Sequence, residues 1–154
     1  MRLVDFFRLS VKMDRPMVSL DDEMEMLEAY MELMCYRYPE LQCEYDIDPE
    51  LGGMKVPNFI LQPIVENSLL HGLKNKGYRG EVRISARKTQ DNRMEILVSD
   101  TGSGFAEGKK PAIDQMLLTY SKQPAKLEGN SIGILNVQKR IKLLCGRNQS
   151  LCFG

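Results

Sequence analysis

Two short segments of this sequence combine residue types that could bind a nucleotide. The first, residues 61–71, is an apolar stretch that carries Glu66, Asn67 and His71 among its hydrophobic positions. Asn67 and His71 are four residues apart, so in a helix they lie on one face. The side-chain carbonyl of Asn67 is a hard oxygen ligand that suits Mg²⁺, with most of the coordination left to phosphates and water.

The second segment is the aspartate and glycine sequence at residues 100–104. Asp100 ends a run of strand-forming residues, and a carboxylate there can accept a hydrogen bond from the exocyclic amine that distinguishes adenine from guanine. Gly102 and Gly104 have no side chains, so the backbone can adopt a positive φ and approach a flat ligand closely. Each signal alone is weak, because glycine-rich turns are common on protein surfaces.

Composition limits the function classes that need to be considered. A chain of 154 residues is expected to form one domain, with room for a short appended element. The formal net charge is zero, so nothing in the composition indicates nucleic acid or an anionic membrane as a partner. No apolar run approaches the roughly 18 residues of a membrane span. The four cysteines lack metal-type spacing and the chain has one histidine, so a zinc site is not expected. We expect the cysteines to be reduced thiols in the cytoplasm.

The pattern along the chain predicts two parts. Residues 1–38 are expected to be helical, with an interruption near residues 14–16 and a second helix that opens at Ser19, a good N-cap followed by three acidic residues. The apolar positions of that second helix are rich in methionine and predict core or dimer packing. Residues 39–154 are expected to form the second part.

In the second part, periodicity predicts strands at 42–47, 81–88 and 93–99, with a hairpin turn at 90–92. Helices are predicted at 58–72 and 132–144. Pro63 is compatible with the first of these only if the helix begins within the preceding turn or kinks there, and Gly72 suits its C-terminal stop. These elements predict an α/β two-layer sandwich, with helices on one face of a mixed, mainly antiparallel sheet.

Three ordered segments resemble the motifs of the GHKL (Bergerat) ATP-binding fold, which histidine kinases and gyrase share. Residues 56–67 with His71 and Gly72 resemble the N box, residues 100–104 resemble the G1 box, and residues 132–146 resemble the G2 box and its helix. The flanking residues 18–38 narrow the resemblance to sensor histidine kinases of the LytS/YesM type, where they look like the end of the dimerisation region. The resemblance implies the fold predicted above, with a catalytic ATP-binding domain at 39–154.

The resemblance also implies ligands and roles. ATP and Mg²⁺ are the expected cofactors, a lid is expected between the G1 and G2 boxes, and a histidine is the expected phosphoryl acceptor. Asn67 would bind Mg²⁺, and Glu66 would either order the Mg²⁺ shell or a water, or pair with a nearby Lys or Arg. Asp100 would bind the adenine amine. The remaining candidates for ATP contact are His71, Lys74, Gly102, Gly104, Ser131, Gly133 and Arg140, with Asn75 and Lys76 as further phosphate or ribose candidates.

Some positions depart from the family pattern and leave alternatives open. Family members that hydrolyse ATP carry a glutamate four residues before the Mg²⁺ asparagine, and here that residue is Pro63. Leu70 replaces a frequent lysine, and Ser131 replaces the first glycine of the G2 box. The alternatives are a degenerate, non-catalytic signalling module and another GHKL enzyme, either a serine kinase or a DNA-dependent ATPase. Pro63 argues against both of these enzymes, and the neutral charge argues further against the DNA enzyme.

The phosphoacceptor is expected to lie outside this chain. The one histidine, His71, falls in the N box, where it would be either a structural group near the helix end or a phosphate contact. We therefore expect a fragment of a longer, membrane-anchored bacterial sensor that lacks the C-terminal G3 box and last strands. Its expected partners are a response regulator and a second copy of itself, and it is expected to be cytoplasmic, with no nucleic-acid partner and no direct membrane contact.

Overall fold

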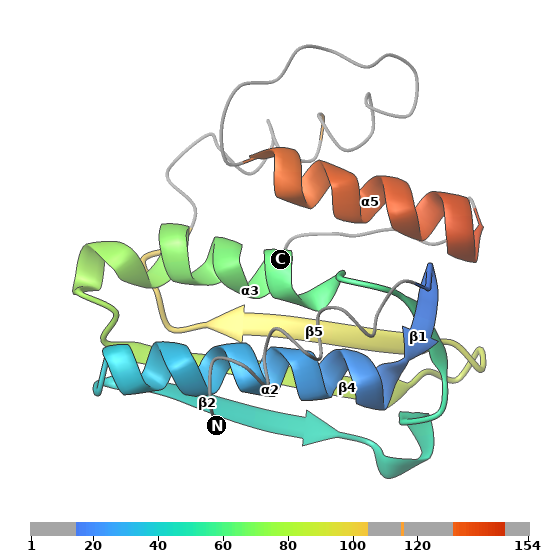
Figure 1. Cartoon of the computed structure of the whole chain (residues 1–154), viewed down its shortest axis with the longest axis horizontal. Helices are drawn as coiled ribbons and strands as arrows, with labels where there is room; N and C mark the ends of the chain where they lie inside the picture. Colours follow the sequence, from blue (N-terminus) through green and yellow to red (C-terminus); the bar gives the residue numbers. More distant parts are fainter. Residues whose placement is uncertain (1–14, 105–114, 116–130, 147–154) are drawn as a thin grey trace.

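The computed structural model describes residues 15–104, 115 and 131–146. Two layers are visible in Figure 1, a sheet formed by β2, β4 and β5 and a layer of helices over one of its faces. The elements in chain order are β1 (Met17–Ser19), α2 (Leu20–Arg37), β2 (Leu41–Ile47), β3 (Lys55–Pro57), α3 (Leu61–Asn67), β4 (Gly80–Lys88), β5 (Met94–Asp100) and α5 (Ser131–Cys145). The predicted α/β sandwich is confirmed.

Helix α2 begins where the sequence predicts. The Ser19 hydroxyl accepts from the backbone N–H of Asp22, and the Asp22 carboxylate accepts from the Ser19 backbone N–H at 3.2 Å. This reciprocal pair satisfies donors that the first turn of a helix otherwise leaves unpaired. The apolar face of α2 lies in the core, which explains its methionine content, through the buried residues Leu20, Met24, Leu27 and Met31.

The sheet has the order β2-β4-β5, with β2 parallel to β4 and β4 antiparallel to β5. Side chains alternate along each strand. Val82, Ile84 and Ala86 of β4 are fully buried beneath the helices, while Arg83 and Arg87 lie on the opposite face with acidic residues of β2. The predicted hairpin turn is confirmed at Asn92, which has a φ of +60°.

Helix α3 begins at Leu61, which places Pro63 in its first turn, where a proline is compatible with a helix. The helical path does not end at Gly72, so that prediction was wrong. It continues as a π-helical turn over Ser68–Leu73 and a 3-10 turn over Lys74–Lys76, and the left-handed residue that ends it is Gly77, with a φ of +66°. Gly72 is needed for a different reason, described below.

The described residues share one hydrophobic core. Leu27 of α2, Val65 of α3, Ile84 of β4 and Val137 of α5 all belong to it, so packing does not separate at residue 38. The assignment of residues 1–38 to a dimerisation region stays a prediction, and residues 1–14 lie outside the described part. Helix α5 packs on α3 and β3 (Figure 1), and β3 pairs with β1 in a small antiparallel sheet. No helix in the described ranges is long and apolar enough to span a membrane.

Candidate functional site

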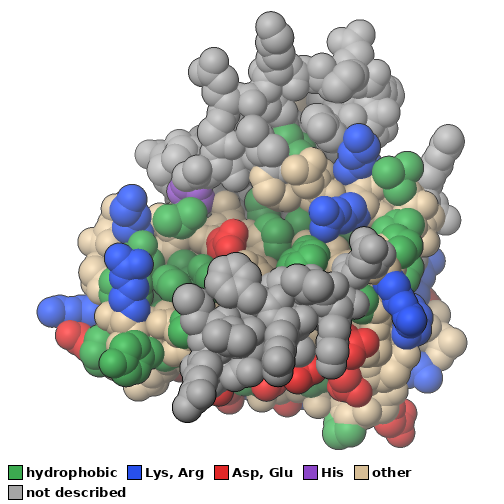
Figure 2. Space-filling view, in the orientation of Figure 1, with side chains coloured by type: hydrophobic (Ala, Val, Ile, Leu, Met, Phe, Trp, Pro, Cys, Tyr) green, Lys and Arg blue, Asp and Glu red, His purple; other side chains and the backbone are tan. Residues whose placement is uncertain are grey.

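A cavity of about 730 Å³ lies between β5, α3 with its π-helical continuation, and α5. Most of its wall is apolar, with Ile64 from α3, Val98 from β5 and Ile141 from α5 among the lining residues. Figure 2, which has the orientation of Figure 1, shows hydrophobic side chains gathered between the helices, with an acidic side chain among them and lysine and arginine side chains on either side. A mostly apolar cavity of this size with a few polar groups is typical of a small-molecule or cofactor site.

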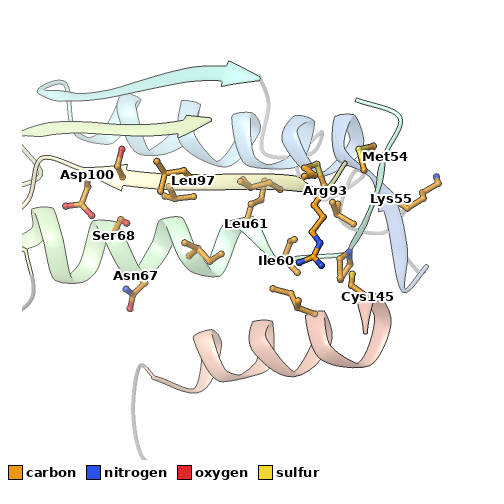
Figure 3. A pocket seen from close by; sticks show the side chains of 18 of the residues that line it. Met54, Lys55, Ile60, Leu61, Asn67, Ser68, Arg93, Leu97, Asp100 and Cys145 are labelled. Atoms are coloured by element: carbon orange, nitrogen blue, oxygen red, sulfur yellow. The ribbon is translucent and has the colours of Figure 1, made fainter. Parts of the chain in front are cut away.

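One end of the cavity holds the polar groups of the two site segments, and Lys55 and Arg93 lie at the other end (Figure 3). Asn67, Ser68 and His71 contribute from the helix, and Asp100 faces them from the end of β5 (Figure 3). The structure therefore brings together the two segments that the sequence singled out, although they are about thirty residues apart. They meet because β5 ends beside the π-helical turn that follows α3.

The carboxylate of Asp100 is oriented by its own loop. Oδ1 accepts a hydrogen bond of 2.8 Å from the backbone N–H of Gly102, while Oδ2 has no hydrogen-bond partner recorded among the described residues. One oxygen is thus held by the backbone, and the other can accept a hydrogen bond from a ligand.

Three further contacts fasten the glycine loop to the helix. The Ser103 backbone N–H donates to the Gly72 carbonyl at 3.1 Å. The Lys76 ammonium donates to the carbonyls of Thr101 at 2.7 Å and Gly102 at 3.2 Å. The position of the Asp100 carboxylate therefore depends on the turns after α3 as well as on β5.

The glycines allow this close approach. A Cβ on Gly72 would overlap Asp100 Oδ1, and a Cβ on Gly102 would overlap both that oxygen and the Gly72 backbone. The predicted positive φ is found at Gly104, which lines the cavity with a φ of +69°, but not at Gly102. A glycine is required at residue 102 because the backbones of Gly102 and Gly72 touch there and leave no room for a side chain.

Glu66 does not line the cavity. Its Oε1 accepts a hydrogen bond of 2.9 Å from the Gln62 amide, one turn earlier in α3, and no ion pair with a lysine or arginine is recorded for it in the described ranges. Burial, and to a smaller extent Glu66, raises the pKa of Tyr30 on α2 to about 12. Glu66 therefore lies on the α2 side of the helix, and its role in ordering the Mg²⁺ shell or a water stays a prediction.

The basic candidates lie outside the cavity wall. Lys74 is exposed in the 3-10 turn. Lys76 is engaged by the glycine loop, and Arg140 of α5 donates to the Asn58 carbonyl at 2.8 Å. None of the three lines the cavity as described, so their predicted contacts with phosphate or ribose stay predictions.

The G2 segment is only partly described. Ser131 is the first residue of α5, and its side chain is outside the described part. At Gly133, a Cβ would meet Pro63 at 3.7 Å, an ordinary van der Waals distance, so packing alone does not require a glycine there. The lid predicted between the G1 and G2 boxes falls on residues outside the described ranges, apart from Gln115.

The sequence placed Glu23 among the acidic residues of the first turn of α2 but did not indicate that it is buried. This residue of α2 is buried, and its carboxylate accepts hydrogen bonds from three consecutive backbone N–H groups at the start of α3. A signal was present, because Glu23 falls at helical spacing between the core positions Leu20, Met24 and Leu27, where a charged residue requires a buried partner.

Comparisons with known proteins show the family of this chain. The profile of the histidine kinase-, DNA gyrase B-, and HSP90-like ATPase family matches residues 58–150. The chain is 32% identical to the sensor protein LytS of Oceanobacillus iheyensis over 152 residues, which are 97% of this chain and 25% of that protein. It is 31% identical to the sensor histidine kinase YpdA of Escherichia coli over 143 residues, 92% of this chain and 23% of that one.

Among solved structures, the blue-light activated histidine kinase of Erythrobacter litoralis EL346 has a similar fold. The TM-score is 0.53 at 15% identity, over 92% of this chain and 46% of that one. The chain spans about a quarter of the length of the curated relatives it matches. On the family profile, the fold and the paired site segments, the chain belongs to the histidine kinase-, DNA gyrase B-, and HSP90-like ATPase family, and it is similar to proteins named sensor protein LytS.

Proposed function

We propose that this chain binds ATP in the cavity between β5, α3 and α5 and positions its terminal phosphoryl group for transfer to a histidine outside these 154 residues. The observation that carries the proposal is the Asp100 carboxylate. One of its oxygens is held by the Gly102 N–H, and it lines the same end of the cavity as Asn67. An oriented acceptor at one wall suits the adenine amine, and a neutral oxygen ligand on the facing helix suits a Mg²⁺ ion that is bound to the phosphates.

The residues present fit an adenine ring. The Gly72 and Gly102 backbones lie against Asp100 without side chains between them. Asp100 would accept from the adenine amine, whereas guanine presents a carbonyl oxygen at that position and would be repelled. The apolar side chains of Ile64, Ile96 and Val98 line the cavity beyond Asp100 and would cover the ring and exclude water from it.

The donor set also fits a magnesium ion that arrives with the nucleotide. Among the described residues, no group of three histidine, cysteine, aspartate or glutamate side chains could hold a metal ion. Asn67 would then supply one oxygen ligand, with the others from phosphates and water, as is usual for Mg²⁺. The ion would neutralise charge on the phosphates, which is the main requirement of phosphoryl transfer.

Pro63 favours transfer to a protein histidine over hydrolysis. It lies one turn before Asn67 in the first turn of α3 and has no group that can take a proton from water. Glu66 is turned toward Gln62. Phosphoryl transfer depends mainly on positioning and charge neutralisation, so a kinase can function without a base at this position.

We further infer that the chain acts as the cytoplasmic part of a longer, membrane-anchored sensor, works as a homodimer and passes its phosphoryl group to a response regulator. The support for this is that relatives such as the LytS protein of Oceanobacillus iheyensis are named sensor proteins, and that this chain matches about a quarter of their length.

The binding step is tested by calorimetric titration of ATP, with and without Mg²⁺, into the wild type and Asp100→Asn. Replacing one carboxylate oxygen by an amide places a donor against the adenine amine, so we expect binding to weaken by about ten- to a hundredfold. Asp91→Asn, in the exposed hairpin turn, is the matched control and should bind like the wild type. The wild type should also prefer ATP to GTP. Failure of the wild type to bind ATP would overturn the proposal.

The transfer step is tested by incubating the chain and Mg²⁺ with ATP labelled on the γ-phosphate and a LytS-type kinase fragment that carries its acceptor histidine. Label on that histidine supports the kinase. Release of phosphate without label on the histidine would indicate another ATPase of the family. Nucleotide binding with neither product would indicate the non-catalytic signalling module.

A further inference from the structure

Glu23 is a buried carboxylate that the proposed chemistry does not use. It belongs to the first turn of α2 and is 3% exposed. Its Oε1 accepts from the backbone N–H groups of Ile60 at 2.7 Å and Leu61 at 2.9 Å, and its Oε2 accepts from that of Phe59 at 3.0 Å. One side chain thus joins α2 to the start of the helix that carries Asn67.

Helix α3 depends on this contact because it lacks a cap of its own. The residue at its N-cap, Ile60, has no side chain that can accept a hydrogen bond. A helix leaves its first four N–H groups without a helical partner. Here those residues are Ile60, Leu61, Gln62 and Pro63. Glu23 satisfies the first two, and Pro63 has no N–H. The preceding Phe59 has a φ of +57°, an unusual conformation for a side chain of this size, and Glu23 also binds its N–H.

The same junction reaches α5. The Arg140 guanidinium donates to the carbonyl of Asn58 at 2.8 Å, next to the three N–H groups that Glu23 accepts. Arg140 also interacts favourably with the Glu23 charge. The start of α3 is therefore held from two sides, by a carboxylate on α2 and by a guanidinium on α5.

We propose that Glu23 is a positioning residue for the nucleotide site, which sets the rotation and axial position of α3 so that Asn67 faces the cavity. This proposal rests on the proposed function. A helix turns by about 100° for each residue, so a slip of one residue would carry Asn67 off the cavity wall. The buried residues Leu61, Val65 and Leu69 hold the helix on the core, but apolar contacts have no preferred direction. Hydrogen bonds do, and the three bonds to Glu23 fix the first turn.

One consequence concerns signalling within the chain. Because the anchor of α3 belongs to α2, a movement of α2 along its axis pulls on the first turn of α3 and shifts Asn67. Helix α2 is thereby coupled to the magnesium end of the site through one carboxylate.

The experiment is a double-mutant cycle on the complete 154-residue chain, with Glu23→Gln, Asn67→Ala and the double variant. The amide can accept from Ile60 and Leu61 but turns an N–H₂ group toward the Phe59 N–H. We expect Glu23→Gln to weaken Mg²⁺-ATP binding by about five- to twentyfold, which lies within the range found for residues that act on a site without touching its ligand. In the Asn67→Ala background the same change should alter binding by less than about twofold.

Two controls separate positioning from a loss of folded protein. Adenosine without Mg²⁺ lacks the phosphates and the ion that Asn67 would hold, so Glu23→Gln should weaken adenosine binding by a smaller factor than it weakens Mg²⁺-ATP binding. Glu25→Gln, exposed on the same helix, should leave both affinities unchanged. If Glu23→Gln does not fold, Glu23→Asp takes its place, since it keeps the charge and shortens the side chain.

The outcomes distinguish the two proposals. Wild-type binding of Mg²⁺-ATP with an equal effect of Glu23→Gln in both backgrounds would overturn the positioning role and leave the proposed function standing. Equal losses for adenosine and Mg²⁺-ATP would also overturn it, because a general loosening of the fold affects both ligands. A wild type that binds no nucleotide would overturn both proposals.

Discussion

The Asp100 carboxylate lies directly against the α-carbon of Gly72, so that residue 72 has no room for a side chain. A Cβ there would overlap Oδ1, the oxygen that accepts from the Gly102 N–H. The contact joins the end of β5 to the π-helical turn after α3. It also makes the two site segments a single packed unit, and the first prediction follows from it.

We expect Gly72→Ala to displace Asp100 and weaken ATP binding by at least about tenfold, with a stability loss of about 1–3 kcal/mol from overpacking. Calorimetric titration and urea unfolding measure the two effects. Gly53→Ala is the matched control, because a Cβ at that exposed residue would meet nothing within 4 Å. Unchanged ATP affinity in Gly72→Ala would contradict the close contact.

Gly104 tests the effect of backbone conformation, whereas Gly72 tests the steric effect of an added Cβ. Its φ is +69°, and nothing lies within 4 Å of the position of a Cβ. Gly77 has almost the same φ, +66°, and the same open surroundings, but it does not line the cavity. Alanine should cost each position about 1 kcal/mol of stability. Only Gly104→Ala should also weaken ATP binding, and an equal loss of affinity in both variants would rule out a local role for Gly104.

Lys76 and Lys74 are two residues apart and differ in their contacts. Lys76 holds the glycine loop through the carbonyls of Thr101 and Gly102, and Lys74 is exposed. Lys76→Met should weaken adenosine and ATP by the same factor, about two- to tenfold for one charged hydrogen-bonding group. A phosphate contact would instead weaken ATP alone. Titration of both ligands into Lys76→Met and Lys74→Met therefore separates loop holding from phosphate binding at each lysine.

The sequence was sufficient wherever the signal was local. The Ser19 cap, the alternation in β4 and β5 and the turn at Asn92 are set by residues within one turn or one pair of strands, and all three are confirmed. The two site segments could also be predicted, because their residue types alone indicate which ligand groups they could bind. The three-residue strands β1 and β3 were missed, since each is defined by a partner about forty residues away.

The features that the sequence did not indicate depend on tertiary contacts. Gly72 has the appearance of a helix stop, but its role is set by Asp100 on another element. The sequence also did not indicate that the Lys76 ammonium donates to the backbone carbonyls of the glycine loop. In each case the residue contacts a separate segment of the chain, and its neighbours in the sequence do not indicate which one.

Glu23 also predicts how stability should depend on pH. Burial raises the pKa of its carboxyl, and this effect exceeds the opposing effects of the Leu61, Phe59 and Ile60 N–H groups and of Arg140. The folded state then holds the Glu23 proton more tightly than the unfolded state, whose carboxyl titrates near the ordinary value of 4.5. The free energy of unfolding should therefore fall as pH rises through the window that starts near that value and ends at the raised pKa.

Glu23→Gln removes this titration, so the difference in unfolding free energy between wild type and variant isolates it. Asp46, whose pKa is lowered mainly by its hydrogen bond to Arg87, contributes with the opposite sign but is common to both proteins and cancels. Urea unfolding from about pH 4 to 7 should show the stability of the wild type, relative to the variant, decreasing as pH rises. A relative stability that increases with pH would mean that the three N–H bonds outweigh burial, and that the ionised carboxylate is the form that α3 prefers.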